Sequence, residues 1–237
     1  MRKLFFLSII FFWNCSEEPK RITISKVIGS PQFSKAKLSL SDSIYNDNGN
    51  YFFSFNIDEY SLGEQTQKDF DYKLANSDKG QHIHLIINNG PYFAKYSNKF
   101  NQKIEKENNV ILAFLSRSYH ESIKNPNAYL LTKTGDNNKI DLNGEFIFYS
   151  RPKGTYEGEA TKKLLLDFYL INTNLSSKGN KVRATINDTE FIIDEWVSYY
   201  IEGLPKGEVS VKLELINSEG NLIQTPYNPS TRKIILK

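Results

Sequence analysis

The chain contains 237 residues, 39% of them hydrophobic, with 14 Tyr and 16 Phe, so it is long enough for one large or two modest domains and too apolar to be disordered. Its 30 Lys and Arg residues nearly balance 27 Asp and Glu residues, which argues against binding to nucleic acid or another polyanion. The single cysteine excludes a disulfide framework and any Cys-x-x-Cys metal or redox site.

The N-terminus predicts a bacterial export signal. Residues 1–3 include two basic side chains, and residues 4–13 form an apolar run that is too short to span a membrane. Cys15 follows directly, at the position of the lipid-modified cysteine in bacterial lipoproteins. Residues 1–14 therefore resemble a lipoprotein signal peptide, and residues 15–20 are expected to form a tether that begins at the lipidated Cys15.

The sequence around the cleavage site departs from the usual lipoprotein pattern. Phe12 and Asn14 stand where Leu and a small residue are normal, so the alternative is an uncleaved hydrophobic tail with a chance cysteine. Glu17 and Glu18 resemble the signals that send some Gram-negative lipoproteins to the cell surface. We expect an exported protein that is lipid-anchored to the cell envelope, at the outer membrane and with access to the cell surface.

The rest of the chain has the alternating pattern of short β-strands. Turn sequences rich in Asn, Asp and Gly separate these segments, and helix is scarce. The expected strands are 21–27, 36–40, 51–57, 81–87, 110–115, 129–132, 145–149, 164–171, 181–186, 191–197, 209–215 and 232–236.

An internal repeat divides the chain into two parts. Residues 80–89 and 179–188 both read as a glycine, an alternating strand and an Asn-rich turn, and equivalent strands precede and follow them. We therefore predict an all-β fold of two tandem immunoglobulin-like antiparallel β-sandwich domains, comprising residues 21–155 and 160–237. A single larger sandwich is the structural alternative.

Two of the three histidines, His82 and His84, lie two residues apart on one predicted strand. Their side chains therefore point to the same face, with Cα atoms about 6.5–7 Å apart. The alternating apolar residues of this strand are expected to face the core: Ile83, Leu85 and Ile87. We expect both histidines to point outward, because Lys181 and Arg183 occupy the matching positions of the repeat.

His120 follows the 110–115 strand and is a candidate third ligand, with Glu121 in reach, if that strand neighbours 81–87. Histidines that converge in this way bind zinc or copper, and the ligand set does not choose between the two metals. The alternative interpretation is two solvated strand histidines and a loop histidine bonded to backbone.

The segment 80–92, Gly-Gln-His-Ile-His-Leu-Ile-Ile-Asn-Asn-Gly-Pro-Tyr, resembles uncharacterised bacterial lipoproteins that carry a His-rich strand ahead of an Asn/Asp turn. The resemblance covers about residues 50–130. It implies an immunoglobulin-like fold for this part of the chain and no established activity.

Aromatic residues near the histidines suggest a binding surface. Tyr92, Tyr96 and Tyr119 are candidates for an exposed platform that recognises a protein or glycan ligand. The long loops 63–79, 97–108 and 116–128 are the expected recognition surface, because sandwich modules usually bind through loops.

Standard catalytic signatures are missing from the sequence, including the nucleophile elbow, the phosphate-binding loop and His-Glu-x-x-His. We therefore expect a non-enzymatic envelope lipoprotein that binds or scaffolds an unknown ligand and uses no catalytic residue. Binding or delivery of copper or zinc is the first alternative. A hydrolase-like enzyme, which would need a convergent pair of acids, is the second.

Overall fold

The computed structural model describes residues 21–69, 74–135 and 140–237, which form an all-β protein with strands β1 to β17 and one 3-10 turn, η1 (Gly158–Thr161). The expected signal peptide, the tether and Cys15 lie outside the described residues. Within the described ranges, no helix is long and apolar enough to cross a membrane.

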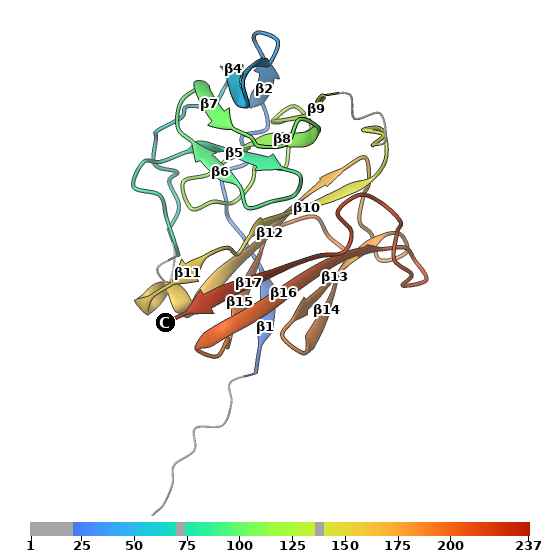
Figure 1. The fold of residues 1–237 in the computed structure, drawn as a ribbon. Helices are drawn as coiled ribbons and strands as arrows, with labels where there is room; N and C mark the ends of the chain where they lie inside the picture. Colours follow the sequence, from blue (N-terminus) through green and yellow to red (C-terminus); the bar gives the residue numbers. More distant parts are fainter. Residues whose placement is uncertain (1–20, 70–73, 136–139) are drawn as a thin grey trace, which may run out of the picture.

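The first sandwich, in the upper half of Figure 1, is built from two sheets that enclose an apolar core. One sheet consists of β2 (Lys37–Leu40), β3 (Tyr45–Asp47), β4 (Asn50–Asp58) and β7 (Lys99–Lys103). The facing sheet has the order β6 (Phe93–Lys95), β5 (His82–Ile87), β8 (Asn109–Ser116) and β9 (Tyr129–Thr134).

The second sandwich, in the lower half of Figure 1, has the same construction. One sheet has the order β1 (Thr23–Lys26), β15 (Tyr199–Glu202), β12 (Lys163–Ile171) and β10 (Phe146–Arg151). The facing sheet has the order β11 (Thr155–Tyr156), β17 (Ser230–Leu236), β16 (Gly207–Ile216), β13 (Lys181–Ile186) and β14 (Thr189–Ile193).

Local sequence explains how these strands form and turn. In β4, Tyr51, Phe53 and Phe55 are buried while Phe52 on the opposite face is exposed, as period-two alternation requires. The β3–β4 hairpin closes at Asn48 and Gly49, which both have positive φ, 48° and 83°. A two-residue loop with both residues in this region matches the twist of the flanking strands, which is why Asn-Gly was a reliable turn signal.

The strand pairing shifts the expected domain boundaries. The first domain predicted from the sequence, residues 21–155, includes β1 and β10, but β1 pairs with β15 and β10 pairs with β12, so both belong to the second sandwich. The described chain therefore has its first strand, β1, in the second sandwich, builds the first sandwich with β2 to β9, and then returns to the second with β10. The place of β10 is consistent with sequence order, because a short connection links it to β12. The place of β1 cannot be predicted from sequence order, because its partner β15 lies far along the chain.

The pairing follows the internal repeat. β4, β5, β6 and β8 occupy the same places in the first sandwich as β12, β13, β14 and β16 in the second. The Asn turns match as well, because the side chain of Asn88 accepts a hydrogen bond from Val110 N, and that of Asn187 accepts one from Ser210 N. Tandem immunoglobulin-like sandwiches are thus the fold of the described chain.

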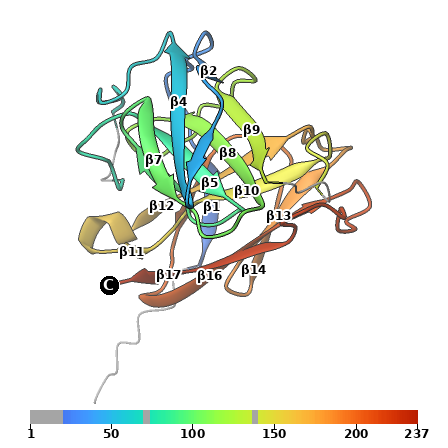
Figure 2. The ribbon, with the colours of Figure 1, turned by 45° about the horizontal axis from the view of Figure 1, so that its top comes forward.

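The two sandwiches are joined by a third apolar cluster, which makes the molecule a stack of four sheets (Figures 1 and 2). The outer face of β5 and β8 packs against the outer face of β10 and β12, and we call this contact the seam. Its buried members come from both sandwiches: Ile86, Tyr92, Val110, Leu112, Phe114, Phe146, Phe148, Tyr169 and Ile171. Because the seam covers the second face of β8, every residue of that strand is buried.

Candidate metal centre

The three histidines meet at the seam. His82 and His84 project from β5, and His120 comes from the loop after β8. The exposed fractions of these side chains are 0%, 0% and 9%, so the expectation that His82 and His84 point to solvent is wrong. The two do share a face, as alternation predicted, but the second sandwich covers that face. The matching face of β13 has no such cover and keeps Lys181 and Arg183 half-buried.

The imidazole rings converge at hydrogen-bonding distance. His82 Nε2 lies 2.9 Å from His84 Nε2 and 3.1 Å from His120 Nδ1. One potential ligand atom from each ring lies within 4.8 Å of the other two. The predicted third ligand, His120, is thus brought to the pair. Glu121 is instead held by Arg117 in a buried ion pair of 3.4 Å.

The remaining nitrogens of two rings have their own partners. His82 Nδ1 lies 2.8 Å from the carbonyl oxygen of Gly80, and His84 Nδ1 lies 3.3 Å from Ser150 Oγ. A carbonyl only accepts hydrogen bonds, so His82 carries its proton on Nδ1 and directs the lone pair of Nε2 into the cluster. Outer contacts of this kind orient histidines that ligate metals.

These contacts leave the three inner nitrogens in conflict when no ion lies between them. His82 Nε2 has one lone pair in the ring plane, yet it is approached by both His84 Nε2 and His120 Nδ1. This lone pair can accept a well-directed hydrogen bond from only one neighbouring N–H, so at the second contact either another N–H competes for the same lone pair or two lone pairs face each other. A metal ion accepts a lone pair from each ring and satisfies all three nitrogens at once.

His120 occupies a backbone conformation that favours glycine. Its φ is +70°, and its N–H donates to Arg117 O at 2.9 Å. In the second sandwich the equivalent turn has Gly220, with a φ of +85° and an N–H that donates to Asn217 O at 3.0 Å. A histidine in place of glycine therefore accepts backbone strain, which is typical of positions selected for their side chain.

The surroundings keep the rings neutral. The pKa of His82 is lowered to about 4, chiefly by burial; the hydrogen bond to Gly80 O opposes this shift, and the charges of Arg151 and Lys153 contribute to it. Burial also lowers the pKa of His84 and His120 well below the usual range, with further contributions from neighbouring rings and the same two cations. Neutral imidazole is the form that binds metal ions.

Basic and aromatic side chains from the seam border the cluster. The Tyr92 ring stacks on His84 with centroids 3.5 Å apart and an interplanar angle of 9°. Lys153 Nζ lies 3.6 Å from the centroid of the Tyr92 ring, and the Arg151 guanidinium lies 5.3 Å from it. The pKa of Lys153 is lowered to about 8, chiefly by burial. Sequence reasoning missed Ser150, Arg151 and Lys153, because only the seam brings the end of β10 to β5.

The expected platform of exposed tyrosines is not present. Tyr92 and Tyr119 are only 3% and 1% exposed, and their rings fill the space around the histidines and the adjoining loop. Tyr96 is partly exposed; its ring lies 5.0 Å from that of His82, and its hydroxyl bonds to Ser77 Oγ at 2.7 Å. The exposed large aromatic residues of the described chain lie elsewhere: Tyr45, Phe52 and Phe93.

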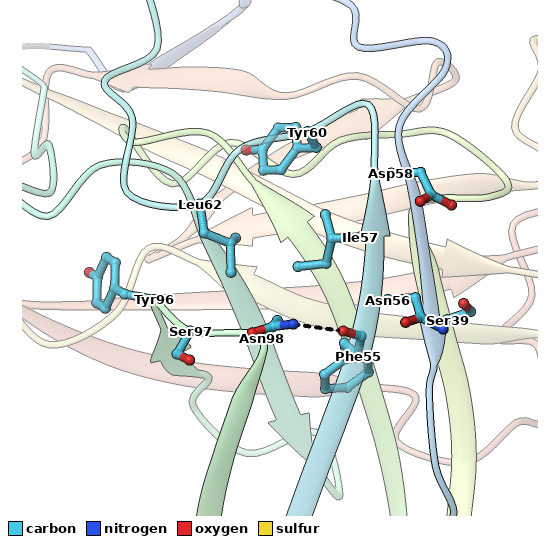
Figure 3. Close-up of a pocket in the computed structure, with 10 residues that line it drawn as sticks. All are labelled: Ser39, Phe55, Asn56, Ile57, Asp58, Tyr60, Leu62, Tyr96, Ser97 and Asn98. Carbon is cyan, nitrogen blue, oxygen red and sulfur yellow. Dashed lines mark hydrogen bonds between the residues drawn. The ribbon is translucent and has the colours of Figure 1, made fainter.

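A surface groove of about 680 Å³ lies beside Tyr96, at the end of β4 (Figure 3). Its floor carries Phe55 and Ile57, and Asn98 closes one side by donating a hydrogen bond to Phe55 O at 3.1 Å. Leu62 and Ile57 face each other across it (Figure 3). The groove is separate in chemistry from the histidine cluster, because it offers hydroxyl, amide and carboxylate groups next to apolar side chains.

A buried ion pair fastens the two sandwiches near the histidines. Lys124, from the loop that also carries His120, donates to Asp167 Oδ1 of β12 at 2.6 Å. The hydroxyls of Ser122 and Ser198 donate to the same oxygen at 2.9 and 2.7 Å. Asp167 is fully buried, so this network, which we call the latch, holds the His120 loop against the second sandwich.

No protein-family model and no curated protein matches the chain. Among solved structures, fibronectin(III)-like modules of Clostridium thermocellum CbhA align with 84% of this chain and 94% of their own, at 9% identity and a TM-score of 0.31.

The central fibronectin-III array of RIM-binding protein aligns at 12% identity over 85% of this chain and 69% of its own, with a TM-score of 0.26. The FN1–FN3 domains of chicken CNTN1 align at 10% identity over 85% of this chain and 67% of theirs, with a TM-score of 0.23. Because identities and TM-scores are low, the fold assignment rests on the strand pairing of this chain.

Proposed function

We propose that this chain is a non-enzymatic binding module whose ligand is a copper or zinc ion held by His82, His84 and His120. The observation that carries the proposal is the approach of two ring nitrogens to the single lone pair of His82 Nε2. The outer bonds to Gly80 O and Ser150 Oγ support it, because they orient two of the rings for ligation. The strained backbone of His120 supports it as well.

The buried acids favour binding over catalysis. The buried carboxylates of the described residues are Glu121, Asp167 and Glu214, and each is paired with a lysine or arginine. A hydrolase would need two of them to converge on a pocket with perturbed pKa values. Glu214 has a lowered pKa, chiefly because Arg183 donates a hydrogen bond to it, so it does not resemble a general acid.

The site is proposed to work outside the cytoplasm, on a protein that is held to the envelope by a lipid on Cys15. This part of the proposal is supported by the basic start, the short apolar run and the position of the cysteine. Recognition of a protein or glycan is the second candidate function, and the groove beside Tyr96 is the observation that favours it.

The test is metal content and metal titration of the chain from residue 16 onward. The wild type is expected to bind one Cu(II) or Zn(II), and the His82→Ala/His84→Ala variant to bind none in the same range. Lys181→Ala/Arg183→Ala is a matched control, because it removes two basic side chains from the equivalent strand of the repeat. Equal binding by all three proteins would refute the metal site. A wild type that binds neither Cu(II) nor Zn(II) would refute it too. The second candidate function would then be tested by comparing glycan binding by the wild type and by Tyr96→Ala.

A further inference from the structure

The outer face of the sheet that contains β4 is bare, whereas its equivalent in the second sandwich is covered. The repeat places Phe52 of β4 at the position of Leu165 of β12. Leu165 is 5% exposed, because the first sandwich lies against the outer face of β12. Phe52 is 41% exposed and its neighbour Tyr45 is 64% exposed, because their sheet ends the stack (Figures 1 and 2). Exposed apolar side chains that lie together on one face indicate a docking surface.

Strand register arranges the side chains of this surface, which we call the end face, in rows. Residues 50–52 of β4 pair with β3 and also with β7, so these two strands lie on opposite edges of β4. In the central row the rings of Tyr45 and Phe52 pack with their centroids 5.8 Å apart. The two rows that the register fixes are Tyr45–Phe52–Asn101 and Asp47–Asn50–Lys103. The end face therefore has an aromatic centre.

Charges of opposite sign lie on the two edges of the end face. Lys99 and Lys103 project outward from β7, because side chains alternate along a strand. Asp47 lies on the opposite edge, and Asp42 precedes the same strand and lines a hollow of about 500 Å³ beside Phe52. Asp47 and Lys103 are two strand spacings apart, about 9.5 Å. Within the described residues none of these four charged groups forms an ion pair, so all four are available to a partner.

We propose that the end face binds the end face of a second copy of this chain, about a twofold axis that runs parallel to β4 through Phe52. Rotation about this axis exchanges the β3 and β7 edges and keeps each row in place. Lys103 of one copy therefore meets Asp47 of the other, and the contact occurs twice because the axis is twofold. Lys99 likewise meets the edge that carries Asp42. The aromatic pairs of both copies lie in the centre, where burial of apolar surface drives association.

Other arrangements of two copies fit the charges less well. A twofold axis perpendicular to the strands would place lysines against lysines, and like charges oppose association. Head-to-tail stacking would use the outer face of β13 and β16, whose charges already pair with one another, as Arg183 does with Glu214 at 2.9 Å. The end face spans only three strands and is small for a dimer interface, so we expect a Kd in the micromolar range.

Sedimentation velocity of the metal-free chain from residue 16 onward tests the dimer independently of the metal site. The wild type is expected to pass from monomer to dimer as its concentration rises through the micromolar range. Lys103→Asp and Asp47→Lys each place like charges at both contacts, so each variant alone is expected to dimerise at least about tenfold more weakly. An equimolar mixture of the two variants is expected to dimerise again, because both contacts of the mixed dimer then join opposite charges.

Lys206→Asp is the matched control, because it makes the same change of charge at an exposed position of the second sandwich and is expected to leave dimerisation unchanged. Lys103 and Asp47 are exposed as well, and circular dichroism checks that their variants fold. A wild type that stays monomeric overturns the proposal, and a glycan whose binding is abolished by Phe52→Ser would then assign the end face to a sugar. A dimer that Lys103→Asp does not weaken, or a mixture of the two charge variants that stays monomeric, overturns it too.

Discussion

The variant His120→Gly tests whether His120 is a metal ligand or only a packing residue. Glycine suits this test better than alanine, because it also relieves the positive φ at this position. The substitution relieves the positive φ of +70°, which is worth about 1–2 kcal/mol for a residue that bears a Cβ. It also removes ring contacts with His82 and Tyr92, at centroid distances of 5.0 and 6.0 Å, each worth about 0.5–1.5 kcal/mol. The two lost contacts total about 1–3 kcal/mol against about 1–2 kcal/mol of relieved strain, so the metal-free variant is expected to be less stable than the wild type by at most about 2 kcal/mol.

Metal is expected to create the difference. At a concentration one hundred times Kd, an ion that binds only the folded state stabilises the wild type by about 2.7 kcal/mol. A variant that binds one hundred times more weakly gains only about 0.4 kcal/mol under the same conditions. For a chain of this length the gap corresponds to a shift in Tm of about 5–10 °C.

The assay is thermal unfolding of His120→Gly and the wild type, followed by circular dichroism with and without Zn(II). Equal metal-induced shifts in both proteins would contradict the ligand role of His120. The ligand role would also be contradicted if metal-free His120→Gly were several kcal/mol less stable than the metal-free wild type. That result would mean that the imidazole serves packing alone. Gly220→Ala in the equivalent turn is the control for backbone strain, and it is expected to lower Tm equally with and without Zn(II).

Three further predictions concern the latch, pH and the anchor. Asp167→Ala is expected to lower the free energy of unfolding by about 3–5 kcal/mol in urea titrations, because it leaves the Lys124 ammonium without a carboxylate to balance its charge; a loss below about 1 kcal/mol would contradict the latch. His82, with its pKa lowered to about 4, stays neutral in the folded protein while the unfolded chain takes up a proton below about pH 6.5. The contribution of His82 to metal-free stability should therefore be complete above that pH and fall by about 3 kcal/mol as the pH drops to about 4. His84 and His120, whose pKa values are also lowered by burial, add to this loss, and a flat profile in urea titrations would refute the reasoning. Cys15→Ala is expected to move the protein from the detergent phase to the aqueous phase in detergent partitioning of bacterial cells, and unchanged partitioning would refute the lipid anchor.

Much of the fold follows from local sequence. The alternation of apolar residues predicts most strands, and dipeptides such as Asn48-Gly49 predict the hairpins, because these signals depend only on neighbouring residues. The repeat predicts that β5 and β13 occupy equivalent places, as the strand pairing shows. The same alternation puts His82 and His84 on one face, and it identifies Ile83 and Leu85 as core residues.

Only the tertiary structure decided which faces are covered. A period of two says which side chains share a face but not what lies against it, so His82 and His84 could not be told from the half-buried pair at Lys181 and Arg183. The continuous apolar runs in β8 and β12 do indicate burial on both faces, yet they do not say that these strands meet across a seam. That contact brings Ser150, Arg151 and Lys153 to β5, and it turns a pair of strand histidines into an enclosed cluster because both sandwiches must bury the same apolar surface.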